Sequence, residues 1–226
     1  SGAKSTASYS IAIGENSIAS ANRAVSLGKG NTAGGIEAVA IGSSNTATGT
    51  GGYIAYAFGN TNTATGIGSV ALGTEAKATI KTQIAMAAGK FAAVGDAQGS
   101  TFILRSDTTD ATAEAMTTNN STAAADNQIV AASDTCITFH GTITAMQNGA
   151  QAYGGWEIKG MLVNDGGTTS LALGNVSDMA ANNASSWAVA LSADNTNNAL
   201  KIQVTGEASH NIRWVANVQT SEVTYA

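Results

Sequence analysis

Short runs of alternating small and large apolar residues recur along the first part of the chain, up to position 88, and a glycine closes each run. Segments 10–14, 24–28, 38–42, 55–59 and 69–73 all follow the order small, large, small, large, glycine. Successive closing glycines are separated by 14, 14, 17 and 14 positions, and a weaker copy at 84–87 keeps the regular spacing. The long interval contains Thr50-Gly51-Gly52, which we interpret as a three-residue turn insertion. A fixed period of this length is typical of a repeat architecture.

Each 14-residue unit also carries a second mark. An alanine stands five positions after every reference glycine, and three of these alanines close the Asn-Thr-Ala triplets 31–33, 45–47 and 62–64. The alternating run predicts one short strand, the glycine a turn, and the triplet a second short strand. We therefore predict a parallel solenoid of about six coils, with large residues such as Ile41 pointing inward and small Ala and Ser forming a flat outer surface.

This repeated motif, together with the intervening Asn-x-Ala, resembles the YadA-like head repeat of trimeric autotransporter adhesins over about residues 8–88. The resemblance implies a left-handed parallel β-roll in which three identical chains pack side by side. Similar repeats occur in trimeric phage tail fibres. The insertion at Gly51-Gly52 and the replacement of the glycine by Ala87 depart from the pattern, and Ala87 suggests a terminal coil.

The two halves of the chain differ in composition. Residues 1–100 hold 17 of the 26 glycines and a net charge of +2, whereas residues 101–226 hold all three tryptophans and a net charge of −7. We therefore predict a β-roll over 1–90, a connector over 91–100 and a second domain over 101–226. Because the chain opens with Ser-Gly-Ala rather than Met, we interpret it as a fragment of a longer polypeptide.

Residues 101–226 predict seven to eight antiparallel strands separated by turns rich in Asn, Asp and Gly. The strand segments are 129–130, 136–145, 156–163, 170–173, 187–191, 199–204 and 212–218. Alternation within 200–204 and 212–218 predicts one buried and one solvated face. The fold class expected for the whole chain is all-β, with a trimeric left-handed parallel β-roll followed by an antiparallel, jelly-roll-like β-sandwich. Segments 156–160 and 206–216 resemble a carboxy-terminal β-domain of phage tail-fibre and other virion proteins.

Few residues in the chain suit catalysis or metal binding. Neither His140 nor His210 lies in a nucleophile motif, and Cys136 lies about 13 Å along a strand from His140, too far for one zinc ion. The acids available as paired carboxylates for glycan cleavage are Asp107, Asp110, Glu114, Asp126 and Asp134, which we interpret as solvated loop charges. The tryptophans 156, 187 and 214 are expected in the core. We predict no enzyme, no catalytic residue, no metal and no cofactor.

The charge and hydropathy of the chain exclude further partners. Only 11% of the residues are charged and the net charge is −5, which argues against nucleic acid. The lone Cys136 excludes an intramolecular disulfide. No apolar run is long enough to span a bilayer, so we predict no membrane insertion.

We therefore predict a homotrimeric phage tail-fibre protein in the virion, whose tip binds a host cell-surface polysaccharide or outer-membrane component and whose shaft joins other virion or tail proteins. The receptor-binding residues expected from turn position are Asn148, Tyr153, Asp165, Asp194 and Asn197. Three alternatives stay open: the head of a bacterial trimeric autotransporter adhesin on the cell surface, a purely structural decoration or connector of the virion, and a tailspike-like depolymerase, which would require a carboxylate-lined cleft. The absence of heptads after the repeats favours the phage origin.

Overall fold

The structure is a computed structural model that describes residues 2–149 and 151–225, and it is all-β apart from one short 3-10 turn. The chain divides into two compact units, one ending at Ser100 and the other spanning Thr101–Tyr225.

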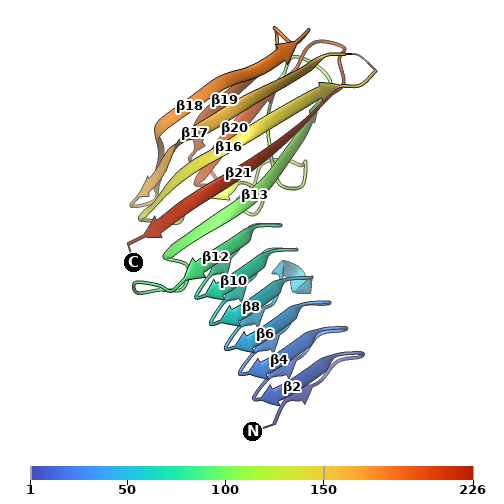
Figure 1. Ribbon diagram of the computed structural model, residues 1–226, viewed down its shortest axis with the longest axis vertical. Coiled ribbons are helices and arrows are strands. Elements are labelled where there is room, and N and C mark those ends of the chain that lie inside the picture. Colours follow the sequence, from blue (N-terminus) through green and yellow to red (C-terminus); the bar gives the residue numbers. More distant parts are fainter. Residues whose placement is uncertain (1, 150, 226) are drawn as a thin grey trace. The chain divides into compact units, whose positions relative to one another are not determined.

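The first unit is a parallel β-solenoid of about six coils (Figure 1). Each coil contributes one long strand and one short strand, and each kind of strand stacks into its own sheet. The long strands are β2 (Ile11–Glu15), β4 (Val25–Lys29), β6 (Val39–Ser43), β8 (Tyr56–Asn60), β10 (Val70–Thr74) and β12 (Ile84–Ala88). The short strands are β1 (Lys4–Ser5), β3 (Ile18–Ala19), β5 (Thr32–Ala33), β7 (Thr46–Ala47), β9 (Thr63–Ala64) and β11 (Lys77–Ala78).

Strand pairing follows the sequence repeat without slippage. Gly42 pairs with Gly28 on one side and Gly59 on the other, although the second step contains the turn insertion. The inserted residues form η1 (Thr50–Gly52) at a corner of the coil, as the sequence predicted. Gly42 has a φ of 119°, and a Cβ on it would lie 2.0 Å from the Gly59 carbonyl oxygen, so the stacking requires glycine here.

The predicted orientation of the long strands is wrong. Ala40 is fully buried, whereas Ile41 is 37% exposed, so the small residues face inward and the large ones outward. The physical reason is the width of the coil. The inward residues of the long strands face the inward alanines of the short strands, such as Ala33 and Ala47, and together they form a core of alanine side chains. A 14-residue coil closes around methyl groups and leaves no room for isoleucine.

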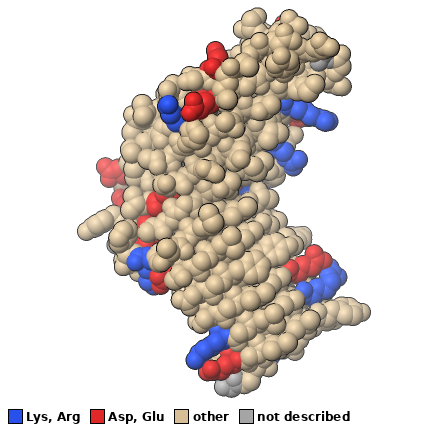
Figure 2. All heavy atoms as spheres, viewed as in Figure 1, with Lys and Arg blue, Asp and Glu red and all other residues tan. Residues whose placement is uncertain are grey.

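The outward large residues of the long strands form a continuous pair of columns, which we call the apolar stripe. Ile11, Ile13 and Met86 in this stripe are 48%, 61% and 55% exposed. The full set is Ile11, Ile13, Val25, Leu27, Val39, Ile41, Tyr56, Phe58, Val70, Leu72, Ile84 and Met86. The side of the roll seen in Figure 2 is largely uncharged between its edges, where the charged side chains gather.

A ladder of buried asparagines ties successive coils together. Asn45 Nδ2 donates to the carbonyl oxygens of Ile41 (3.0 Å) and Gly59 (2.7 Å), and Asn45 Oδ1 accepts from the backbone N–H of Asn62 (3.0 Å). Asn31 and Asn62 make equivalent bonds in their own coils. Because all three side chains are fully buried, these bonds satisfy backbone groups that water cannot reach.

The second unit contains two sheets. The large sheet has the order β18 (Thr168–Asn182), β17 (Tyr153–Asp165), β16 (Thr135–Gln147), β21 (Ile212–Thr224) and β13 (Ala97–Thr108). In the small sheet, β20 (Ala199–Thr205) pairs with β14 (Ala113–Ala115), β15 (Ile129–Val130) and β19 (Ala188–Asp194). Each predicted strand segment coincides with one of these strands, but most of the strands are longer; β18 extends nine residues and β21 six residues beyond the predicted end. The strands β13 and β14 were not predicted.

A tryptophan cluster forms part of the core of the second unit. The ring of Trp214 lies 5.3 Å from that of Trp156 and 5.6 Å from that of Trp187, and its Nε1 donates to Thr108 Oγ1 at 3.0 Å. All three rings are buried, so the prediction that they are core residues is confirmed. The finer assignment of a jelly-roll-like sandwich stays a prediction.

Replacing Asn45 with leucine should destabilise the roll strongly. The substitution keeps the branching at Cγ but removes the side-chain hydrogen bonds to the Ile41 and Gly59 carbonyls and to the Asn62 N–H, at about 1–3 kcal/mol for each buried group. We expect a loss of several kcal/mol from a typical margin of about 5–15 kcal/mol, measured by denaturant unfolding. Thr46→Val, on the outward side of the adjacent position, is the matched control and should change stability by less than about 0.5 kcal/mol. Equal effects of the two substitutions would contradict a structural role for the ladder.

Candidate functional site

The turns of the second unit place the five predicted receptor-binding residues in two groups. Asn148 lies in the turn between β16 and β17, and Tyr153 begins β17, whereas Asp165 ends the same strand about 40 Å away. Asp194 and Asn197 lie at the turn from β19 to β20. This turn belongs to the Asp165 end, because the backbone N–H of Thr169 donates to Asn195 Oδ1 at 2.9 Å.

At the Asp165 end, polar side chains fix the turns. The Asp194 carboxylate accepts hydrogen bonds from the backbone N–H groups of Thr196 (3.0 Å) and Asn197 (3.2 Å) and from Asn197 Nδ2 (2.8 Å). Burial alone raises the pKa of Asp194, but these hydrogen bonds outweigh it and hold the pKa below its usual value. Asp194 and Asn197 are therefore engaged with each other within the turn.

Asp165 lines a mainly apolar hollow of about 470 Å³ at this same end. The walls are Asp134, Thr135, Cys136, Val163, Asn164, Asp165, Val223 and Tyr225. Asp134 Oδ1 accepts from the backbone N–H of Gly166 at 3.1 Å, so its carboxylate also contributes to a turn.

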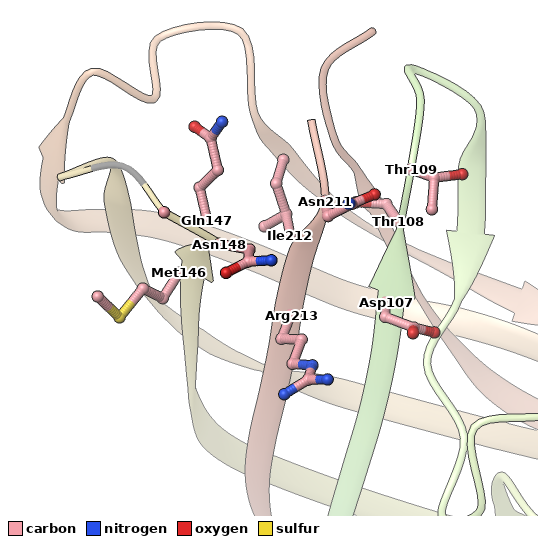
Figure 3. Close-up of a pocket in the computed structure, with 10 residues that line it drawn as sticks. Asp107, Thr108, Thr109, Met146, Gln147, Asn148, Asn211, Ile212 and Arg213 are labelled. Atoms are coloured by element: carbon pink, nitrogen blue, oxygen red, sulfur yellow. The ribbon is translucent and has the colours of Figure 1, made fainter. Parts of the chain in front are cut away.

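A larger hollow of about 560 Å³, which we call the end hollow, lies at the opposite end (Figure 3). Three segments meet there: the end of β13, the turn after β16 and the start of β21. The backbone N–H of Asn148 donates to the Asn211 carbonyl at 2.9 Å and joins two of them. The lining residues are Asp107, Thr108, Thr109, Met146, Gln147, Asn148, Gly149, Asn211, Ile212 and Arg213.

The end hollow combines hydrogen-bonding groups with apolar surface. Asp107, Arg213 and the amides of Asn148 and Asn211 supply acceptors and donors. Met146 is 61% exposed and pairs across the sheet with Tyr153, which is 48% exposed. Arg213 has no ion-pair partner among the residues that the structure describes. Such a mixture suits a ligand that carries both hydroxyl groups and apolar faces.

A second hollow of about 400 Å³, the side hollow, shares Asp107 with the end hollow. Its walls are Ser106, Asp107, Glu114, Ala115, Asn120, Ser121, Thr122 and Ala123. Asn120 Nδ2 donates to Asp107 Oδ1 at 2.7 Å, and Ser106 Oγ donates to Glu114 Oε2 at 3.0 Å. Sequence reasoning considered Asp107 and Glu114 only as possible carboxylates for cleavage. It missed Asn211 and Arg213, because the binding candidates were chosen from turns and Arg213 lies within the predicted strand 212–218.

The two histidines are each paired with a glutamate. His140 Nε2 lies 3.0 Å from Glu157 Oε1 on an exposed sheet face, and His210 Nδ1 lies 3.2 Å from Glu207 Oε2. Within residues 2–149 and 151–225, no group of three or more His, Cys, Asp and Glu side chains could hold a metal ion. The same residues contain no helix long and apolar enough to cross a membrane.

Solved structures with some similarity to the chain are distant in sequence. A tailspike protein gp49 from Acinetobacter baumannii bacteriophage Fri1, described as a capsular polysaccharide depolymerase, is 10% identical with a TM-score of 0.33, and the match covers 85% of this chain and 39% of that protein. The tailspike protein of Acinetobacter phage vB_ApiP_P1 is 10% identical with a TM-score of 0.26, over 97% of this chain and 49% of that one. The chain thus spans less than half of either protein. No curated protein sequence matches it.

The family comparison concerns the first unit. The model of the YadA head domain repeat matches residues 5–31, 33–52 and 55–76. These segments cover the coils in which the glycine pairing and the asparagine ladder were described above. Over these residues the chain therefore matches the YadA head domain repeat.

Proposed function

We propose that the protein is a non-enzymatic subunit of a homotrimeric phage tail fibre that binds a polysaccharide or outer-membrane component on the host surface. In this proposal residues 1–90 form a left-handed roll, 91–100 a connector and 101–226 a jelly-roll-like tip. The observation that carries the proposal is the end hollow, where carboxylate, guanidinium, amide and apolar groups meet at one end of the second unit.

The apolar stripe supports the trimer. Contiguous exposed apolar surface of this extent is rare on monomeric proteins and marks an interaction surface. The stripe places large apolar side chains at the same two positions of every coil, so copies of the same chain are the natural partners. The ion pairs of the roll, such as Arg23 with Glu37 and Lys29 with Glu15, involve residues outside the stripe.

Ile41→Asp should separate the trimer. A carboxylate within the stripe would be desolvated at the interface, so we expect the mass measured by light scattering to fall from about three times 22.4 kDa towards 22.4 kDa. Ala40→Asp, at the neighbouring position, places the charge inside the closed coil instead and should reduce the strand signal in circular dichroism by the contribution of the roll. A wild-type protein that is monomeric at micromolar concentration, or an Ile41→Asp variant that stays trimeric, would contradict the trimer.

The end hollow supports recognition. Asn148 and Tyr153, two of the five predicted residues, contribute to it or to its apolar rim, and Arg213, Asp107 and Asn211 extend the set. Asp165, Asp194 and Asn197 lie at the other end, where the hydrogen bonds of Asp194 with Asn197 and of Asp134 with Gly166 fix turns. Binding at one hollow is expected to be weak, and three copies in one trimer would multiply it by avidity.

Asn148→Trp should weaken binding to the host surface. The indole would occupy the end hollow, and we expect at least about a tenfold loss of affinity. The assay is binding of the labelled full chain to a panel of encapsulated bacterial strains and to their purified surface polysaccharides. Thr168→Trp, an exposed substitution at the opposite end of the same sheet, is the matched control and should bind like the wild type. Incubation with the bound polysaccharide should release no reducing ends, and release would favour a depolymerase.

The YadA head repeats favour one second candidate, the head of a bacterial trimeric adhesin on the cell surface. In that case the roll would be the adhesive element and would bind collagen or other matrix proteins. Binding of the full chain to immobilised collagen, abolished by substitutions in the roll and unaffected by Asn148→Trp, would replace the tail-fibre proposal. A chain that binds neither polysaccharide nor matrix protein would support a purely structural virion connector.

A further inference from the structure

We propose that the ligand is the interior of a linear polysaccharide, which crosses Asp107 and occupies both the end hollow and the side hollow. This inference rests on the proposed function, since it names the class of ligand that the same end of the unit would take.

The two hollows adjoin at one side chain. Asp107 near the end of β13 lines both of them, with Arg213 and Asn148 in the end hollow and Glu114 and Thr122 in the side hollow. Their volumes of about 560 and 400 Å³ each fall in the range of roughly 300–1,000 Å³ that is typical of small-molecule sites. A ligand confined to one sugar unit would leave one hollow unused, whereas a chain of units would fill both.

A hydrogen bond fixes the Asp107 side chain at the junction of the two hollows. Its Oδ1 accepts the 2.7 Å bond from Asn120, and no other described residue donates to its Oδ2. An ionised carboxylate has free acceptor capacity on such an oxygen, which hydroxyl groups of a sugar satisfy with charge-assisted hydrogen bonds. The carboxylate at the junction thus offers a fixed hydrogen-bond acceptor to the sugar that lies between the two hollows.

The charges of the two hollows differ. Arg213 is the cation of the end hollow, whereas the side hollow carries the carboxylates of Asp107 and Glu114 and has no cation among its described lining residues. Anionic groups would be repelled from the side hollow and attracted to Arg213. The sugar in the side hollow is therefore neutral and hydroxyl-bearing, and any acidic substituent of the polysaccharide lies in the end hollow.

The wall of the side hollow is preorganised. Asn127, which is 1% exposed, donates through Nδ2 to Asn119 Oδ1 (3.0 Å) and to the Thr122 carbonyl (2.9 Å), and its Oδ1 accepts from the backbone N–H of Ala124 (2.8 Å). A loop fixed in this way loses little conformational entropy when a ligand binds.

The test uses the full chain and the polysaccharide that binds most strongly in the panel described above. Partial acid hydrolysis and size fractionation give saccharides of one and of three sugar units, and titration calorimetry measures their affinities. We expect the three-unit saccharide to bind the wild type at least about tenfold more tightly than the one-unit saccharide. Thr122→Trp, which fills the side hollow, should remove this difference and leave one-unit binding unchanged, whereas Asn148→Trp should weaken both.

Matched variants keep the outcomes distinct. Ala123→Trp is a second way to fill the side hollow, Thr168→Trp is the control at the far end, and thermal melting verifies that each variant is folded. Equal wild-type affinity for the two lengths, or loss of one-unit binding with Thr122→Trp and Ala123→Trp, would overturn this inference and leave the proposed function intact. If no polysaccharide of the panel binds, the proposed function and this inference fail together.

Discussion

The width of a 14-residue coil is the constraint from which the rest of the first unit follows. The two strands of a coil lie so close together that only methyl groups fit between them. The apolar interior accordingly consists of alanines such as Ala40 and Ala57. Alanine burial contributes little per residue compared with the burial of leucine or isoleucine. The larger apolar side chains therefore remain on the surface of the chain, where they form the apolar stripe.

In the second unit, the large apolar side chains are buried within the chain itself. Its large sheet presents one apolar face to residues of the small sheet, and bulky side chains such as Trp214, Ile143 and Ile202 are buried within a single copy. The opposite face of the large sheet is solvated, with the exposed side chain of His140 bonded to Glu157. Because this core is complete within one chain, the ends of the strands are not needed to complete it. They carry hollows and turns of varied composition, which a repetitive coil lacks.

The sequence predicted the repeat, the register and the position of the extra turn, because glycine and asparagine mark them in successive coils. It did not predict which side of each strand faces inward. The alternation of Ala40 with Val39 and Ile41 distinguishes the two faces of the strand. Because large apolar residues usually face the core, the face of Val39 and Ile41 was predicted to point inward, and this prediction was wrong. The start of β13 was assigned to a connector, because the composition of the chain changes there, although Phe102 and Leu104 continue its alternation.

The candidate site was predictable only in part. Turn composition identified Asn148, but it gave equal weight to Asp194, whose carboxylate is engaged within its own turn. Arg213 and Asp107 lie far apart in the sequence, and their meeting at one hollow depends on strand order, which no local pattern contains.

The asparagine ladder has a mechanical consequence. Hydrogen bonds between parallel coils point along the stack, so tension applied along it is carried by every junction in series. Asn31, Asn45 and Asn62 add side-chain bonds at successive junctions, and the ladder ends where Asn62 Oδ1 accepts from the backbone N–H of Ala76, an alanine in the place of the next asparagine. Each junction that carries one of these asparagines therefore resists stretching better than its backbone hydrogen bonds alone would allow.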